Sequence, residues 1–209
     1  MKSPSLTTLF VILAAAIGTA HAGTCAPPKG FSDTPPPEIL REQIFVTHTE
    51  TIEVARSLEA VHAAASRPLE DQINKSDGLP GISGTYPLTP GEFGTTGSRR
   101  LDCLTDGSSL VEQVLFSDPK RFRYIVWNYT SEKADAVYYG IGEFVYEELG
   151  DKRTRIRWSY SFALDESHFP GRLGALGRFL FRKFFLERDY AEMMRGVLAS
   201  IKTAAESTP

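Results

Sequence analysis

The stretch that decides the fold is 178–206, which reads RFLFRKFFLERDYAEMMRGVLASIKTAAE. It contains no proline and a single glycine, Gly196. Its apolar residues recur at steps of three and four, at Leu186, Tyr190, Met194, Val197, Leu198 and Ile201. This spacing predicts one helix of about seven turns that buries a single apolar stripe.

The residues before this helix are typical of β-strands. Alternating and β-branched runs predict strands at 45–54, 82–89, 97–105, 109–117, 121–130, 136–149 and 153–164. Turn pairs such as Asp106-Gly107 and Gly150-Asp151 favour antiparallel neighbours. After the first strand, Ser57 is a candidate N-cap for a short helix at 58–65, and 69–73 predicts a second helical turn. The order predicts an α+β fold, with a curved antiparallel sheet of about seven strands around the long C-terminal helix.

The amino end reads as a targeting segment. Residues 1–22 combine one positive charge, an apolar run at 9–17 and small residues before Gly23. This pattern predicts a cleaved signal peptide, hence a secreted or periplasmic protein, and excludes cytosolic functions. Residues 23–40 are rich in proline and glycine, which predicts an extended tail or linker. We therefore expect one folded domain over 41–209.

The composition indicates which classes of partner and cofactor to expect. Hydrophobic residues make up 42% of the 209 residues, as in ordinary globular proteins, and the formal net charge is −3. No basic face for nucleic acid is indicated. The two cysteines, Cys25 and Cys103, fit no zinc pattern, and we expect neither a metal nor a cofactor. An oxidising compartment would allow them to form a disulfide that ties the tail to a strand; otherwise one is buried and one is a free thiol.

Five short motifs follow one another in a fixed order within 44–206. They are TIEV at 51–54 with SLEAV at 57–61, VEQVL at 111–115 with Asp118, YGIGE at 139–143, TRIRW at 154–158 and LASIK at 198–202. In this order they resemble the START-like superfamily, whose helix-grip fold is shared by polyketide cyclases, pollen-allergen proteins and plant abscisic-acid receptors. The resemblance implies a cavity between sheet and helix. It does not fix the function, because these proteins include enzymes, receptors and carriers.

Strand alternation sorts the side chains of such a cavity. On 153–164, one face carries Thr154, Ile156, Trp158, Tyr160 and Phe162, and the other carries three arginines, which need water. The apolar face must therefore point to the helix. Matching the family register gives the predicted ligand-binding residues Glu112, Val114, Phe116, Tyr124, Val126, Tyr139, Ile141, Glu143, Trp158, Tyr160 and Met194.

Two carboxylates in this set are the candidate catalytic residues. A buried Glu112 or Glu143 would need a partner or a raised pKa, which suits a general acid or base. The alternative is that each reaches solvent or meets an arginine. The resemblance to the abscisic-acid receptors implies that the position of Glu112 helps to hold a polar ligand group.

Three functions remain open. The first is binding of a small hydrophobic ligand, such as a lipid, a fatty acid or an aromatic polyketide. The second is a cyclase or dehydratase that uses a pocket glutamate as acid or base. The third is a non-enzymatic envelope interaction protein whose interior is filled by side chains. The run at 178–186 mixes aromatic residues and leucines with three cations, which indicates either core packing or transient contact with a membrane surface.

Overall fold

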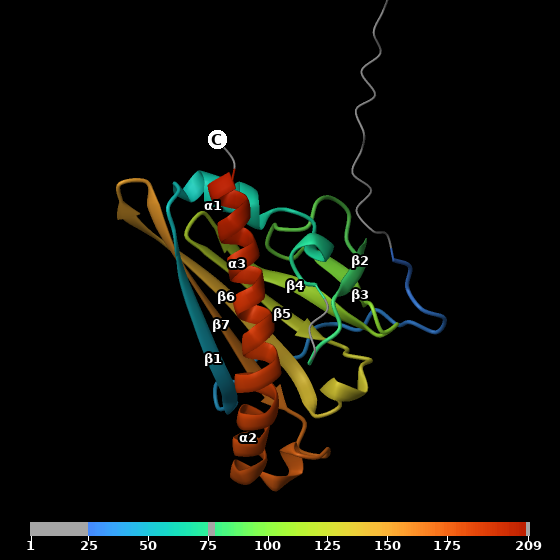
Figure 1. Cartoon of the computed structure of the whole chain (residues 1–209). Helices are drawn as coiled ribbons and strands as arrows, with labels where there is room; N and C mark the ends of the chain where they lie inside the picture. The colour runs from blue at the N-terminus through green and yellow to red at the C-terminus, as the bar shows by residue number, and fades with distance from the viewer. Residues whose placement is uncertain (1–24, 75–77, 208–209) are drawn as a thin grey trace, which may run out of the picture.

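A computed structural model describes residues 25–74 and 78–207. The predicted signal peptide lies outside the described residues. Figure 1 shows one curved antiparallel sheet with the order β1-β7-β6-β5-β4-β3-β2. The strands are β1 (Phe45–Val54), β2 (Ile82–Pro87), β3 (Arg99–Leu104), β4 (Ser109–Asp118), β5 (Arg121–Trp127), β6 (Val137–Gly150) and β7 (Arg153–Leu164).

One helical segment crosses the concave face of this sheet. It runs from α2 (Ala175–Phe181) through a π-helical stretch (Arg182–Tyr190) into α3 (Ala191–Ser207). Between β1 and β2 lie α1 (Leu58–Ala65), which Ser57 caps through its side chain, and a 3-10 turn at Leu69–Asp71. The predicted α+β architecture is confirmed, with strand ends that differ from the predicted ones by at most three residues.

The predicted orientation of β7 is also confirmed. Thr154, Ile156, Trp158, Tyr160 and Phe162 are buried beneath the helix, at no more than 3% exposure. On the other face, Arg155 pairs with Glu53 of β1 and Glu147 of β6. A strand whose one face is apolar and whose other face is charged can be oriented in only one way.

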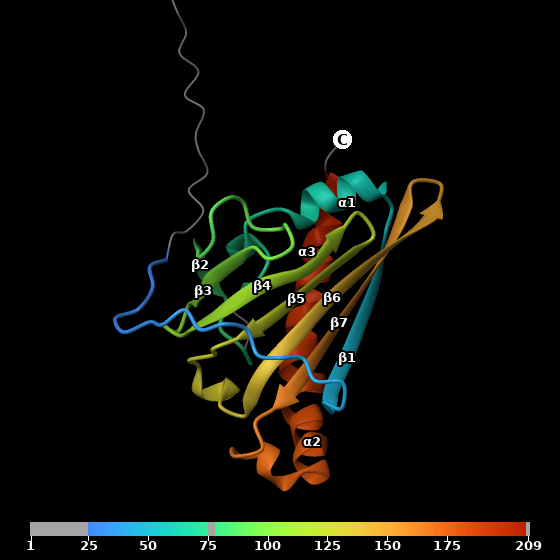
Figure 2. The same cartoon turned by 180° about the vertical axis from the view of Figure 1, so that it is seen from behind.

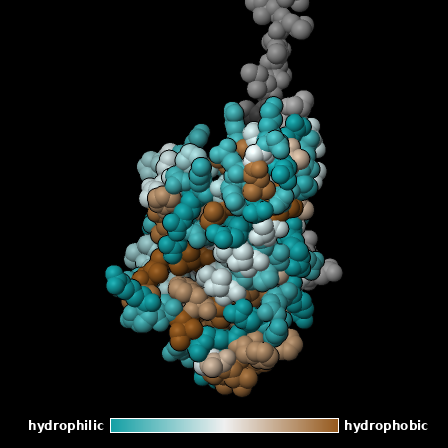
Figure 3. Space-filling model, turned by 90° about the vertical axis from the view of Figure 1, so that its left-hand side faces the viewer, coloured by the Kyte–Doolittle hydropathy of each residue, from teal (hydrophilic) through white to brown (hydrophobic). Residues whose placement is uncertain are grey.

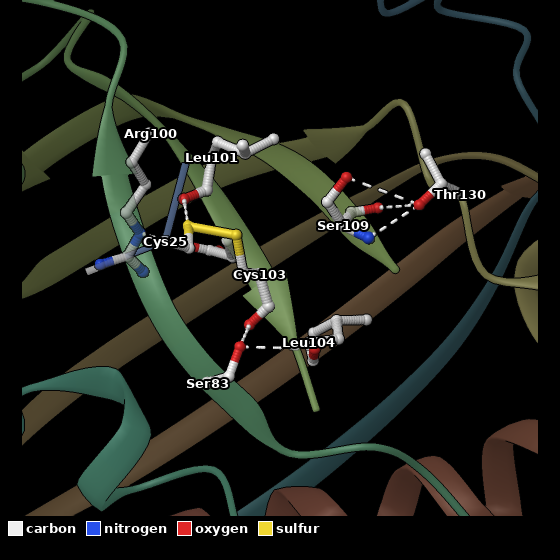
Figure 4. Close-up of a disulfide and its surroundings, with 9 residues drawn as sticks. Cys25, Ser83, Arg100, Leu101, Cys103, Leu104, Ser109 and Thr130 are labelled. Carbon is white, nitrogen blue, oxygen red and sulfur yellow. Dashed lines mark hydrogen bonds and ion pairs between the residues drawn. A yellow bond between two sulfur atoms is a disulfide. The ribbon is translucent and has the colours of Figure 1, made fainter. Parts of the chain in front are cut away.

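The tail before β1 packs on the convex face of the sheet. Figure 2 shows the segment that starts at Cys25 running across this face. Its Cys25 forms a disulfide with Cys103 of β3 (Figure 4). Further along, Asp33 pairs with Arg99, and Trp127 Nε1 donates a hydrogen bond to Thr34 Oγ1. The segment 25–44 is therefore extended, as its prolines predict, and fastened at several points; we call it the strap.

The strap and the convex face enclose a second apolar cluster. Its buried members are Leu101, Val111, Ile125, Trp127, Tyr139, Ile141 and Ala163. Cys25, Phe31 and Phe45 pack against them from outside. The sheet is therefore covered on both faces, with the strap on one side and the helix on the other.

This second cluster corrects the predicted register of β6. Tyr139 and Ile141 belong to the convex face, whereas Phe144 and Tyr146 face the helix. The concave positions between them are Gly140 and Gly142, which have no side chain. A Cβ on Gly142 would lie 2.0 Å from the Tyr124 ring, so this ring occupies the space above the strand. The alternation at 139–143 therefore pointed to the wrong face, because the inward positions there are empty.

Candidate functional site

A cavity of about 710 Å³ lies between the concave face and the helix. Its walls come from β3 to β7, from the segment around α1, and from the helix at Phe185, Tyr190 and Met193. Eleven aromatic side chains line the cavity: Phe93, Phe122, Tyr124, Tyr129, Phe144, Tyr146, Trp158, Tyr160, Phe162, Phe185 and Tyr190. Pockets for small molecules usually measure roughly 300–1,000 Å³, so the volume suits a ligand of that class. An interior filled by side chains, which the third function requires, is not what the fold forms.

Five of the eleven predicted residues line this cavity. They are Glu112, Tyr124, Val126, Trp158 and Tyr160. Glu112 is 5% exposed, and its strand β4 pairs with β5 so that it stands opposite Val126. Trp158 stacks on Phe144 at 4.7 Å between ring centroids and donates a hydrogen bond to Tyr124 Oη.

The other carboxylate, Glu143, lies outside the cavity. It is half-buried on the convex side and forms an ion pair with Arg121 on β5. Its predicted inward position is wrong for the reason that applies to Tyr139 and Ile141, since all three share one face of β6. A mechanism that needs Glu112 and Glu143 on one substrate is therefore ruled out.

Three further predicted residues also lie elsewhere. A bulge between Val114 and Phe116 turns Phe116 outward, where it contacts Arg121, and brings Ser117 and Asp118 to the cavity instead. Val114 is fully buried without lining the cavity.

On the helix, Met194 is fully buried in the core, and its neighbour Met193 lines the cavity. Met193, Val197 and Ile201 recur at steps of four and line the cavity from one edge of the apolar stripe, whereas Met194 lies toward the core.

A buried ionic cluster lies where β3 meets β4. Arg100 donates to Glu112 Oε2 through Nε at 2.9 Å and through Nη2 at 2.5 Å. Its guanidinium also lies 3.8 Å from the centre of the Phe93 ring. Asp102 Oδ1 is 3.0 Å from Arg100 Nε, yet among the described residues it accepts no hydrogen bond of good geometry. One arginine thus faces two carboxyl groups within the cavity wall.

The protonation of Asp102 decides the charge of this cluster. Burial raises the pKa of the Asp102 carboxyl to about 8, because the stabilising effect of Arg100 is smaller and Glu112 adds a second negative charge. The raised pKa favours the protonated carboxyl, which can donate a hydrogen bond. The cluster then holds one positive and one negative charge and is neutral overall.

Four tyrosines supply hydroxyl groups near the cluster. Tyr129 and Tyr160 place their hydroxyl oxygens 3.4 Å apart, and the Tyr160 and Tyr190 rings meet at 4.7 Å. Burial raises the pKa of Tyr124, Tyr160 and Tyr190 well above the usual tyrosine value, so these phenols stay neutral donors. The charge of Glu112 further raises the pKa of Tyr124 and Tyr190, so its carboxylate lies within electrostatic reach of both.

The sequence reasoning missed Arg100, Asp102, Tyr129 and Tyr190, all of which line the cavity. The sequence of β3 did contain a signal for two of them. Asp102 and Cys103 are adjacent on this strand, so their side chains point to opposite faces of the sheet. If Cys103 bonds the tail across the convex face, period-two alternation turns Arg100 and Asp102 toward the helix. Within the described ranges, no group of three or more His, Cys, Asp or Glu residues has the geometry to hold a metal ion.

No protein-family model matches the chain, and no curated protein matches it in sequence. Solved structures do match its fold. Ara h 8.0201 has a TM-score of 0.56 at 13% identity, over 78% of this chain and 98% of its own.

Norcoclaurine synthase from Thalictrum flavum, in complex with dopamine and hydroxybenzaldehyde, has a TM-score of 0.55 at 12% identity. The match covers 80% of this chain and 90% of the synthase chain. The Zhui aromatase/cyclase from Streptomyces has a TM-score of 0.54 at 15% identity. The match covers 77% of this chain and 93% of the aromatase/cyclase chain. The chain therefore has the helix-grip fold that these structures share.

Proposed function

We propose that the protein binds a small hydrophobic molecule in the cavity and holds an uncharged polar group of that molecule against Arg100, Asp102 and Glu112. The observation that carries the proposal is the hollow aromatic interior with one ionic cluster in its wall. Apolar burial supplies the affinity, at about 25 cal/mol per Å² before the cost of association. The few polar groups fix the orientation.

The neutrality of the cluster favours an uncharged ligand group. Glu112 already satisfies Arg100, and the raised pKa of Asp102 favours its protonated form. A ligand carboxylate would add an unpaired negative charge to a buried site, which costs several kcal/mol. A hydroxyl or a carbonyl can exchange hydrogen bonds with Asp102 and the tyrosines without that cost. We therefore favour an aromatic or lipid alcohol, phenol or ketone over a free fatty acid.

Calorimetric titration with a matched pair of probes tests this preference. We expect naphthol to bind at least about tenfold more tightly than naphthoate, a difference of about 1.4 kcal/mol. Naphthalene, which lacks the polar group, should bind more weakly than naphthol. Equal binding of all three would mean that the cluster does not select the ligand, and no binding of any would end the proposal.

Two tyrosines provide a matched pair of variants for the same titration. Tyr129→Phe removes a hydroxyl inside the cavity, so naphthol should bind severalfold more weakly. Tyr139→Phe removes a hydroxyl that is buried on the convex face, where it has no hydrogen-bond partner among the described residues, so binding should not change. A loss of affinity in the Tyr139 variant alone would place the ligand on the wrong face for this proposal.

An acid–base enzyme is the second candidate, favoured by Asp102. A carboxyl group that has a raised pKa and lines a cavity is suited to general-acid catalysis, as a dehydratase requires. Native mass spectrometry of ligands retained from the natural host separates the two functions. If Asp102→Asn retains a molecule of different mass from the wild type, turnover occurs. The same mass in both supports binding alone.

We also propose that the protein acts outside the cytosol, after cleavage between Ala22 and Gly23. The composition of 1–22 supports this, and so does the disulfide between Cys25 and Cys103, since such bonds persist in oxidising compartments. Amino-terminal sequencing of protein from the cell envelope or the medium should begin at Gly23. Recovery from the cytosol with Met1 intact would contradict the proposal.

A further inference from the structure

The end of the molecule at α2 carries an unusual distribution of charge. Between Ser167 and Leu186 the chain has no aspartate or glutamate, although its formal net charge is −3. The same segment contains Arg172, Arg178, Arg182 and Lys183. This segment is thus basic, although the whole chain is acidic.

Large apolar side chains are exposed at this same end. Leu176 is 57% exposed, Phe179 54% and Phe169 61%. Leu176 and Phe179 are three residues apart on α2, so they share one helix face. Figure 3 shows brown and tan atoms gathered at the lower end of the molecule, where Figure 1 places α2.

A second segment extends the apolar surface. Leu40 and Ile44 of the strap are exposed, and they border a groove together with Gly171 and Arg178. We call the set Leu40, Ile44, Phe169, Leu173, Leu176 and Phe179 the apolar tip. Single exposed apolar residues are common on soluble proteins, whereas a group drawn from two segments marks a site of interaction.

The backbone of the tip is closely packed, which explains why its large side chains point outward. A Cβ on Gly171 would lie 2.0 Å from Asp165 O, and a Cβ on Gly177 would lie 1.9 Å from Pro170 O. The turn therefore closes on its own backbone, and Leu173 and Leu176 are exposed beside it. Beyond it, Phe181 is buried in the core and anchors the helix.

We propose that the apolar tip docks on the surface of an anionic phospholipid bilayer. Its leucine and phenylalanine side chains would enter the boundary between headgroups and acyl chains, and the exposed Arg172 would meet lipid phosphates. Some of the cations already have partners: Lys183 pairs with Glu187, and Glu42 and Glu166 border the groove beside Arg178. The remaining positive charge still favours an anionic over a zwitterionic surface. Among the described residues, no helix has the length and hydrophobicity to cross a membrane.

Vesicle co-sedimentation tests the proposal with the protein that begins at Gly23. The probes are vesicles of phosphatidylcholine alone and of phosphatidylcholine mixed with phosphatidylglycerol. We expect the wild type to bind the mixed vesicles about tenfold more tightly, with binding that weakens as salt rises. The double variant Leu176→Asp/Phe179→Asp should lose at least about tenfold in partitioning to the mixed vesicles.

Controls separate the tip from other surfaces and from the cavity. Tyr86→Asp changes an exposed aromatic residue on β2, away from the tip, and should partition like the wild type. Naphthol titration of the double variant should give unchanged affinity, which shows that its cavity and fold are intact.

Three outcomes would overturn the proposal: no binding to mixed vesicles, equal binding by the double variant, or a wild-type dimer that the double variant dissociates in sedimentation velocity without lipid. The last result would assign the tip to a second copy of the chain.

Discussion

The two faces of the sheet are covered by different kinds of structure, and only one of them is hollow. On the convex face the extended strap follows the sheet and fills it, so that Leu101 and Ile125 are inaccessible to solvent. On the concave face the helix packs mainly against β1 and α1, and about 710 Å³ remains open above the other strands. An extended chain adapts to a surface residue by residue. A rigid helix about 10 Å wide meets a curved sheet along one line only.

This difference explains where the protein keeps its buried charge. Beneath the strap the convex face is apolar and closely packed, and its charged pairs, such as Glu143 with Arg121, are partly exposed. The concave face holds Arg100, Asp102 and Glu112 in a wall that borders open space. Buried charge is tolerated where a ligand or water has room to approach, and neighbouring polar groups satisfy it.

The largest expected effect comes from detaching the strap. Replacing Cys25 and Cys103 by serine removes a crosslink between positions 78 residues apart. We expect the free energy of unfolding to fall by roughly 4 kcal/mol, mainly through the entropy of the unfolded chain. Urea unfolding measures the loss. Because the strap covers the convex face, naphthol affinity should change little, and a parallel loss of binding would mean that the two faces are coupled.

The next effect compares the two carboxylates that the sequence treats alike. Glu112→Gln leaves Arg100 without its buried counter-charge and should cost about 3 kcal/mol. Glu143→Gln breaks an ion pair that is partly exposed and should cost less than about 1 kcal/mol. Thermal and urea unfolding of both variants measure the two losses in the free energy of unfolding, and hence their ratio. Losses of equal size would contradict the assignment of these residues to different faces.

A smaller effect depends on pH and tests the charge of the cluster. The folded-state pKa of Asp102 is about 8, above the value of 3.8 for a free carboxyl. Between these values the unfolded chain binds fewer protons at this position than the folded one, so the stabilising contribution of Asp102 is greatest at low pH and falls as pH rises toward 8. We therefore expect the contribution of this group to the free energy of unfolding to fall steadily between about pH 5 and about pH 8.

Asp102→Asn provides the control for this pH dependence. An asparagine amide donates a hydrogen bond as the protonated carboxyl does, and it does not titrate. The variant should therefore lose less stability than the wild type as pH rises, with Arg100 and Glu112 unchanged as its nearest charged groups. Identical pH profiles for the two proteins would show that Asp102 is ionised throughout.

The smallest effect concerns the empty positions of β6. Gly142→Ala places a methyl group against the Tyr124 ring and should cost about 1–3 kcal/mol, with weaker naphthol binding. Gly196→Ala is the matched control, since that glycine is exposed on α3 with no other atom near its Cβ position. It should stabilise the protein by up to about 1 kcal/mol. A neutral Gly142→Ala would show that Tyr124 moves freely in the cavity.

Much of the fold and part of the site could be predicted. The terminal helix, the strand order and the inward face of β7 follow from apolar spacing, because a strand such as 153–164 has one face that cannot be buried. The same reasoning failed on β6. Its inward positions there are Gly140 and Gly142, which have no side chains, and Tyr139 and Ile141 belong to the apolar cluster on the convex face. The reasoning failed again at Phe116, where a bulge shifts the period locally, and at Met194, which belongs to the apolar stripe but lies on its core side.

The sequence by itself determined the elements, their antiparallel order and the helix that covers them, because these depend on local periodicity and turn chemistry. Only the tertiary structure decided which apolar residues face the cavity, since the strap provides a second covering that period-two alternation cannot distinguish from the first. It also decided that Arg100 and Asp102 join Glu112, because strand pairing brings together side chains that are distant in the chain. The ionisation of Asp102 depends on that burial and on those neighbours, so local sequence does not contain it.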